Sequence, residues 1–224
     1  MRHQSVPLGD LCEITASPSS DLFATLTVSA VGTPVVTPAD ITSAQQIRTE
    51  TLRRLPDAPA GVERYRLRSG DLVLVRLGSV GKVALLDADA GDWVYHSSCI
   101  RIRPDLERVN PVYLAAYLAH ASVVDQLLSH VQVGTVPVLT AGSLKSLPVV
   151  LPSLDVQQTM ARALIEVGLQ MDIQQRILGR LESVKQGLLT HLLGDELSGD
   201  AASRPQTLSL DRRAPRTRRT NRMS

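Results

Sequence analysis

The stretch from Asp155 to Leu193 constrains the fold more than any other, because it contains no proline and carries a heptad pattern. Apolar residues occupy the a and d positions of that repeat, and only Gln174 and Lys185 interrupt the seam. At 1.5 Å per residue such a helix would be about 60 Å long, which exceeds the diameter of a small domain. The seam residues are Leu164, Val167, Met171, Leu178, Leu181, Leu188 and Leu192.

A narrow apolar stripe on so long a helix needs a second helix to cover it. The pattern therefore predicts a spacer that also serves as a dimerisation arm. The alternative is a helix folded back on its own domain, although caps and breaks normally end globular helices well before this length.

Charge is distributed unevenly along the chain. The net charge is +2, but residues 203–224 contain seven arginines and one acid, Asp211, for a local charge of +6. Residues 1–202 therefore carry 2 − 6 = −4. An acidic partner must meet a local basic patch, the C-terminal tail, or both. After Gly194 the composition turns to Gly, Ser, Ala, Arg and Pro, which predicts a disordered tail.

The clearest β signal is a hairpin. The run Leu72–Leu77 and the run Lys82–Leu86 are β-rich and are joined by Gly78-Ser-Val-Gly81. A further strand is predicted from Trp93 to Arg103, whose alternation places Arg101 and Arg103 on one face and two isoleucines on the other.

Before the hairpin, residues 37–61 form a polar excursion between short β segments. The part from Ser43 to Leu52 is the candidate for a helix. Long excursions in compact domains are often functional, and the alternative is an ordinary solvated loop.

After the strands the pattern changes to helical period. Asn110 followed by Pro111 predicts an N-cap and first helical residue, with a helix continuing to roughly His130. Ala141 to Ser146 is compatible with one helical turn, and Pro148 to Pro152 with a short extended run. Ser153 is then the expected N-cap of the long helix.

No catalytic constellation is present in the sequence. It contains no phosphate-binding loop motif, no dinucleotide fingerprint and no nucleophile elbow. The five histidines are not paired with Cys or acids at metal-ligand spacing, and Cys12 and Cys99 form neither a metal motif nor a disulfide framework. The N-terminus lacks an apolar signal core and no run approaches membrane-spanning length, so we expect a soluble, cytoplasmic protein.

Five weak motifs occur in a fixed order and together resemble one family. They are GDLVLVRLGSVGKVA at 70–84, HSSCIRIRP at 96–104, NPVYLAAYL at 110–118, GTVPVL at 134–139 and LPVVLPSLDVQ at 147–157. This order resembles the target recognition domain and spacer helix of the specificity subunit of type I restriction–modification enzymes. In the last motif Pro148, Pro152, Leu154 and Gln157 fit the family pattern.

The resemblance implies an α+β fold in three parts. A mixed α/β target recognition domain would span residues 1–153, one long coiled-coil helix 154–194, and a disordered Arg-rich tail 195–224. It also implies a non-catalytic subunit that directs a DNA adenine methyltransferase, and possibly a restriction or phage-defence nuclease, to a bipartite site on double-stranded DNA. The cofactor S-adenosylmethionine would belong to the methyltransferase, and this chain would hold no cofactor or metal.

Family members commonly carry two recognition domains and two helices in one chain, whereas this sequence shows one of each. The resemblance therefore implies a half-size subunit that pairs as a homodimer through its helix, or the specificity component of a related defence or solitary methylation system. Two other function classes remain open from the sequence: a coiled-coil interaction adaptor that binds protein, and an enzyme with an unrecognised site.

Candidate DNA-contacting residues are chosen by residue type and by position on loops and strands. Arginine, lysine, serine, threonine and histidine side chains supply the donors that phosphates and base edges accept. The candidates are Arg48, Arg53, Arg54, Arg76, Ser79, Lys82, His96, Arg101 and Thr135.

Overall fold

The structure is a computed structural model that describes residues 4–17, 23, 25–28, 31–56, 61–86, 92–129 and 138–200, with 194–200 described by their backbone alone. The chain divides into two compact units, Met1–Met171 and Asp172–Ser224, which we call the N-terminal unit and the helical unit. The first turns of the long helix thus belong with the N-terminal unit, beyond the boundary at residue 153 that the sequence suggests.

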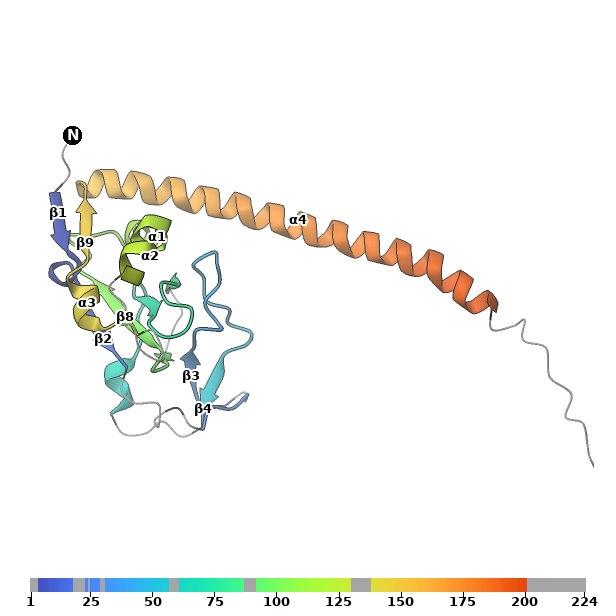
Figure 1. The fold of residues 1–224 in the computed structure, drawn as a ribbon, viewed down its shortest axis with the longest axis horizontal. Coiled ribbons are helices and arrows are strands. Elements are labelled where there is room, and N and C mark those ends of the chain that lie inside the picture. The colour runs from blue at the N-terminus through green and yellow to red at the C-terminus, as the bar shows by residue number, and fades with distance from the viewer. Residues whose placement is uncertain are drawn as a thin grey trace, which may run out of the picture. The chain divides into compact units, whose positions relative to one another are not determined.

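A four-stranded antiparallel sheet forms the centre of the N-terminal unit, in the order β2-β8-β5-β6 (Figure 1). Its strands are β2 (Cys12–Ala16), β5 (Leu72–Val75), β6 (Val83–Leu85) and β8 (Cys99–Pro104). The predicted hairpin is confirmed as the β5–β6 pair, in which Leu72 faces Leu85 and Leu74 faces Val83. All four residues of β5 are buried, so both faces of the sheet are covered.

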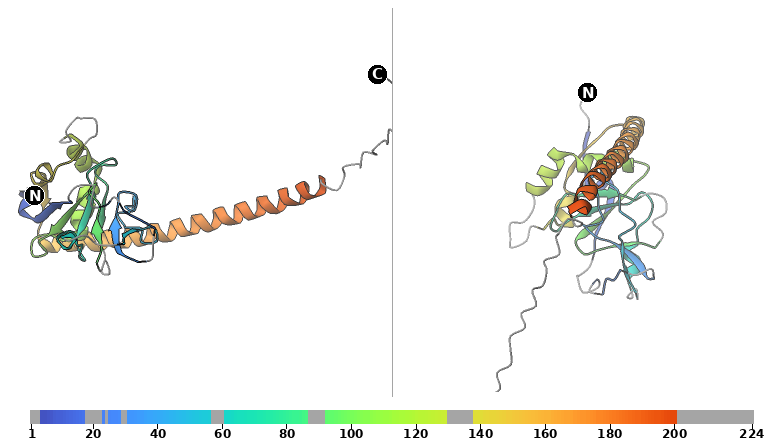
Figure 2. Two further views of the ribbon diagram at one scale, coloured as in Figure 1. Left: turned by 90° about the horizontal axis from the view of Figure 1, so that it is seen from below. Right: turned by 90° about the vertical axis from the view of Figure 1, so that its right-hand side faces the viewer.

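One face of this sheet packs against helices. Leu72, Leu74, Ile100 and Ile102 project from it with no exposed surface and join a core that includes Leu114, Leu118 and Leu127. The helices, which Figure 2 shows from two further directions, are α1 (Pro111–Ala119), α2 (Ala121–Ser129) and α3 (Ala141–Lys145).

The opposite face packs against a second, three-stranded sheet and a 3₁₀ turn. Val73, Val75 and Cys99 contribute to a separate core there, in which Tyr65 meets Tyr95 edge-on with ring centroids 6.0 Å apart. The second sheet has the order β4-β3-β7. Its strands are β3 (Thr33–Val36), β4 (Arg53–Leu55) and β7 (Val94–Tyr95), and the turn is η3 (Val62–Tyr65).

The helix expected from Pro111 to His130 is two helices, and their junction is His120. The N-cap is confirmed, since Asn110 Oδ1 accepts from the N–H groups of Val112 and Tyr113 at 3.0 and 3.2 Å. His120 has an extended backbone with ψ 134°, and its carbonyl accepts from the N–H of Val123. The same residue thus ends α1 and begins α2, which the apolar spacing alone did not reveal.

The expectation of a helix from Ser43 to Leu52 is wrong. This segment consists of turns and isolated bridges, and Gln45 has φ 62°. The buried carboxylate of Asp40 organises the loop instead, because it accepts from the backbone N–H and hydroxyl of Thr37 and from the hydroxyl of Thr51. Local polar groups therefore hold a conformation that helix propensity does not predict.

The strand expected from Trp93 to Arg103 is also interrupted, at His96–Ser98, so that β7 and β8 join different sheets. The predicted alternation within β8 is confirmed: Ile100 and Ile102 face the helical core, and Arg101 and Arg103 face the other side. The predicted helical turn is present as α3, and the predicted extended run is present as β9 (Pro148–Leu151). Strand β9 pairs antiparallel with β1 (Gln4–Pro7), and the 3₁₀ turn η1 (Leu8–Asp10) follows β1 in the chain.

The long helix is α4 (Leu154–Asp200), which extends past the predicted end near Leu193. Its first turns are anchored by Gln157, a polar side chain with no exposed surface. Gln157 Oε1 accepts from the Asn110 N–H at 2.8 Å, and Nε2 donates to the carbonyls of Pro152 at 2.8 Å and Arg108 at 3.3 Å. One amide thus ties the start of α4 to the start of α1.

Replacing Gln157 with leucine should lower the free energy of unfolding by about 1–3 kcal/mol, because the partly buried Asn110 N–H and two backbone carbonyls lose the buried side chain that binds them. Urea denaturation of the full chain measures this change. The matched control is Gln158→Leu, since Gln158 is the exposed neighbour on the same helix. Equal midpoints for the two variants would contradict the anchoring role.

Every seam residue of α4 is exposed in this chain, from 39% for Leu164 to 66% for Leu192. Ile177 and Val184, which are 44% and 60% exposed, occupy the g positions beside the seam and widen it. Exposed apolar side chains repeated at this spacing are typical of a helix that pairs with another helix.

Candidate nucleic-acid interface

The predicted contact residues differ in whether their side chains are already bound within the described part of the chain. Arg48, Arg53, Ser79 and Lys82 are exposed, and their side chains have no hydrogen bond or ion pair to any described residue. We call these four the open loop residues. Arg48 and Arg53 belong to the excursion and β4, while Ser79 and Lys82 belong to the β5–β6 hairpin. Thr135 lies outside the described residues.

The excursion and the hairpin are neighbours in the fold. The N–H of Leu85 on β6 donates to the carbonyl of Gln45 at 3.1 Å, so the excursion runs along the outer edge of the sheet. The hairpin is closed by the Val75 N–H, which donates to the Lys82 carbonyl at 2.8 Å. Gly81 has φ 92°, and a Cβ there would come within 2.9 Å of Val124, so this tight turn requires glycine.

A second group of predicted residues is committed to the backbone. Arg54 Nη1 donates to the Gly32 carbonyl at 2.9 Å, and Arg76 Nε donates to the Ser97 carbonyl at 2.8 Å. Both side chains are partly buried. Each retains further N–H groups, but its first role is to hold a loop in place.

His96 lies between these groups. The Ser98 N–H donates to His96 Nδ1 at 3.1 Å, which places the ring proton on Nε2, and the ring lies 5.1 Å from that of Phe23. Burial, and then the nearby charge of Arg53, lowers the pKa of His96. At neutral pH the ring is therefore an uncharged N–H donor suited to a base edge more than to a phosphate.

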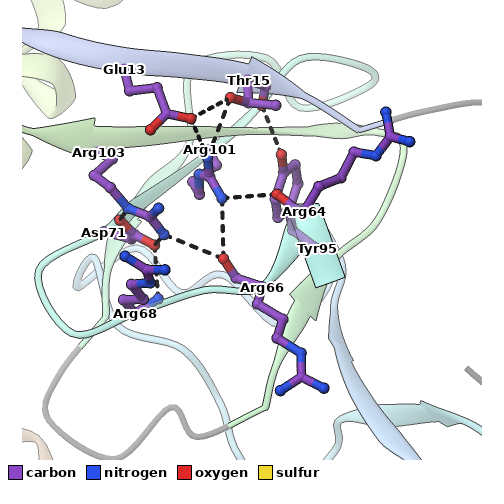
Figure 3. Close-up of polar contacts among 9 residues, drawn as sticks. All are labelled: Glu13, Thr15, Arg64, Arg66, Arg68, Asp71, Tyr95, Arg101 and Arg103. Carbon is purple, nitrogen blue, oxygen red and sulfur yellow. Dashed lines mark hydrogen bonds and ion pairs between the residues drawn. The ribbon is translucent and has the colours of Figure 1, made fainter. Parts of the chain in front are cut away.

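Arg101 is not the exposed contact residue that the strand pattern suggested. Its side chain is 4% exposed. Nη2 donates to Glu13 at 2.6 Å and to Thr15 Oγ1 at 3.3 Å, and Nη1 donates to the carbonyls of Arg64 and Arg66, both at 3.1 Å (Figure 3). Alternation placed Arg101 on the correct face, but the segment from Arg64 to Arg68 covers that face.

Arg103 has a similar structural role. It forms a two-pronged ion pair with the buried carboxylate of Asp71, with both contacts at 2.7 Å, and Nη2 also donates to the Arg66 carbonyl at 3.3 Å (Figure 3). The hydrogen bond with Asp71 raises the pKa of Arg103 above its ordinary value. Two inward arginines thus hold the backbone of the covering segment against β8.

That covering segment displays three more arginines, which the sequence analysis did not select. Tyr65 and Leu67 are buried, whereas Arg64, Arg66 and Arg68 between and beside them are exposed. In Figure 3 the side chains of Arg64 and Arg66 extend away from the Arg101 network. The alternation of arginine with buried apolar residues was the sequence signal that identifies them.

These residues surround a pocket of about 500 Å³. Its lining includes five arginines and three carboxylates, so the formal charge of these groups is 5 − 3 = +2. The arginines are Arg64, Arg66, Arg68, Arg101 and Arg103, and the acids are Glu13, Glu63 and Asp92. We call it the arginine pocket.

The described residues form neither a metal site nor a reactive thiol. Within those ranges no three His, Cys, Asp or Glu side chains gather as a metal site. Burial raises the pKa of both the Cys12 and Cys99 thiols to about 12, which keeps them protonated and unreactive at neutral pH. None of the helices in the described part of the chain is long and apolar enough to cross a membrane.

The family model described as "Type I restriction modification DNA specificity domain" matches residues 3–183. No curated protein sequence matches significantly.

Two solved structures share the fold. One, from work on the complex assembly and conformational transition of the type I R-M system, aligns with a TM-score of 0.60 at 20% identity. The other is the HsdS subunit from Thermoanaerobacter tengcongensis, with a TM-score of 0.57 at 22% identity. Each alignment covers 85% of this chain, but only 44% and 47% of the respective structures. The chain thus spans less than half the length of these relatives.

Proposed function

Because the chain belongs to the family of type I restriction–modification DNA specificity domains, we propose that it reads DNA sequence for a partner enzyme and performs no catalysis itself. The observation that carries this proposal is the family match over residues 3–183, which spans both the N-terminal unit and most of α4. Basic and polar side chains on loops held by a rigid sheet are suited to this task.

The loops around the β5–β6 hairpin supply the groups for direct readout. Arg48, Arg53 and Lys82 are exposed cations with no described partner, and His96 offers a neutral N–H. Arginine can bond guanine through two N–H groups, and lysine can reach either a base acceptor or a phosphate. This combination favours major-groove contact from the hairpin and excursion.

The second part of the proposal concerns assembly. A single recognition domain reads one short sequence, and the exposed seam of α4 lacks a covering helix among the described residues. If two copies pair antiparallel through residues 155–193, the complex has two recognition domains and each helix covers the seam of the other. Overlap centred near Leu178 would place Lys185 close to Met171 and Gln174 of the second copy, where its ammonium can reach an amide or solvent.

A two-fold axis between two copies determines the form of the site. Identical domains related by such an axis read an inverted repeat, with half-sites separated by roughly one to two DNA turns. The partner enzyme in this proposal is a DNA adenine methyltransferase that carries S-adenosylmethionine, and a restriction subunit can join the same complex.

Alanine substitution of the open loop residues tests the readout. Arg48→Ala, Arg53→Ala and Lys82→Ala should each weaken binding to the recognised duplex, and a lost bidentate base contact should reduce discrimination by about 1–3 kcal/mol. Gel shifts against the recognised duplex and against random duplexes separate the two effects, because a lost phosphate contact weakens both alike. The control is Lys145→Ala, an exposed lysine on α3.

Two results would count against this assignment. Wild-type affinity and preference in all three variants would remove the hairpin and excursion from the interface. Sequence-independent binding that disappears on deletion of residues 203–224 would reduce the chain to an adaptor with a basic tail.

A further inference from the structure

We infer that the arginine pocket is a phosphate-binding site for the DNA backbone, with Arg64 and Arg68 as its contact residues. This inference rests on the proposed DNA-reading function and extends it to a surface that carries none of the exposed residues selected from the sequence. The pocket is lined by the segment from Glu63 to Arg68, by β2 and β8, and by Asp92.

Three of the five arginines of the pocket already form an ion pair with a carboxylate, and two do not. Arg101 is paired with Glu13, Arg103 with Asp71, and Arg66 with Asp92. The remaining two, Arg64 and Arg68, are exposed and form no ion pair with any described residue. Their guanidinium groups therefore have donors available for an anion, and a phosphate accepts such donors in a two-pronged geometry.

The backbone that carries these two side chains is fixed from beneath. The Arg64 carbonyl accepts from Arg101, and the Arg66 carbonyl accepts from both Arg101 and Arg103. The Arg68 N–H donates to Asp71 at 2.7 Å, and the Leu67 N–H donates to the Trp93 carbonyl at 2.8 Å. Pre-organised donors lose less conformational entropy on binding, so the buried arginines position the exposed ones.

Arg64 is further restrained by its neighbour. Its guanidinium carbon lies 5.6 Å from the centroid of the Tyr65 ring, a cation–π distance. Tyr65 is itself packed against Tyr95, whose hydroxyl donates to the Thr15 carbonyl at 2.9 Å. The aromatic pair thus links the Arg64 side chain to β2, the strand that carries Thr15.

The carboxylates of the pocket explain why this site would take a phosphate and not any acidic surface. Glu13, Glu63 and Asp92 line the same space as the arginines. These carboxylates repel an approaching anion, so a compact, strongly charged group that bonds directly to the guanidinium donors is favoured over a diffuse acidic patch. The phosphates of duplex DNA have this form and are presented in a regular row.

The test is the salt dependence of DNA binding by the full chain carrying Arg64→Ala and Arg68→Ala together. With a pool of random duplexes as the probe, loss of two phosphate contacts in each of the two paired copies should reduce the slope of log affinity against log salt by about 3.6, since each contact contributes roughly 0.9. The recognised sequence should stay the same. Arg64→Lys with Arg68→Lys should retain most of the slope, because the charge remains.

The control double variant is Lys145→Ala with Arg162→Ala, which removes the same charge from exposed positions outside the pocket. An unchanged slope in the Arg64/Arg68 variant, or an equal change of slope in the control variant, would overturn the phosphate site. Specific DNA binding by the wild-type chain in the same experiment would still support the proposed function. A changed site preference in that variant would show that the pocket reads bases, which also contradicts the inference. Absence of DNA binding by the wild-type chain would instead refute both.

Discussion

Replacing Leu178 and Leu181 together with aspartate should abolish pairing of the chain and its specific DNA binding at the same time. Both leucines lie on the seam of α4 and are 58% and 59% exposed in a single chain. Burial of a leucine side chain contributes about 1.5–3 kcal/mol, and two positions in two copies give four such side chains, or roughly 6–12 kcal/mol. A micromolar dimer is held by about 8 kcal/mol, so the loss is sufficient to separate it.

Light scattering at micromolar concentration measures the expected change from dimer to monomer, and circular dichroism checks that the helix remains. The matched control is Arg180→Asp with Ser183→Asp, which has the same spacing on the same helix but occupies the outward c and f positions. A wild-type chain that is monomeric both alone and with a methyltransferase would rule out the homodimer. A Leu178/Leu181 variant that still pairs would show that another surface holds the copies together.

Substitution of Arg101 by methionine should lower the free energy of unfolding by about 1–3 kcal/mol, as expected when a buried donor that holds backbone carbonyls is removed. Glu13 is 59% exposed and can recover solvent, so the isolated carboxylate contributes little to the loss. Most of the cost arises from the Arg64 carbonyl, which loses the donor beneath the covering segment, whereas the Arg66 carbonyl loses one donor and keeps the bond from Arg103.

Urea denaturation at fixed protein concentration measures this effect, because the stability of a dimer depends on concentration. Arg64→Met is the control, since Arg64 is exposed and should change stability by no more than about 0.5 kcal/mol. If Arg101→Met and Arg64→Met unfold at the same urea concentration, Arg101 does not hold the segment, and its original assignment as a DNA contact becomes the better one.

The elements that could be predicted from sequence are those set by local signals. The glycine-containing link identified the β5–β6 hairpin, Asn110 with Pro111 identified the start of α1, and the heptad pattern identified α4. Each depends on residues close together in the chain. The order of weak motifs then identified the family, because their sequence of occurrence is more specific than any one of them.

The errors arise where distant contacts decide the outcome. Asp40 organises the excursion through Thr51, eleven positions away, and so replaces the expected helix. Arg101 meets Glu13 and the Arg64 carbonyl across long separations, and periodicity shows the face of a strand but not what covers it. The open loop residues Arg48, Arg53, Ser79 and Lys82 are exposed, and their contact with DNA stays a prediction.

The central claim, that two copies of this chain read a two-part DNA site, is tested most directly by selection from a pool of random duplexes. The full chain, prepared with the methyltransferase of the proposed complex, is used to capture duplexes over several rounds, and the captured pool is sequenced. We expect enrichment of an inverted repeat whose identical halves are separated by a fixed spacer of roughly one to two DNA turns. A captured pool with no enriched sequence, or with a motif of two unrelated halves, would contradict it.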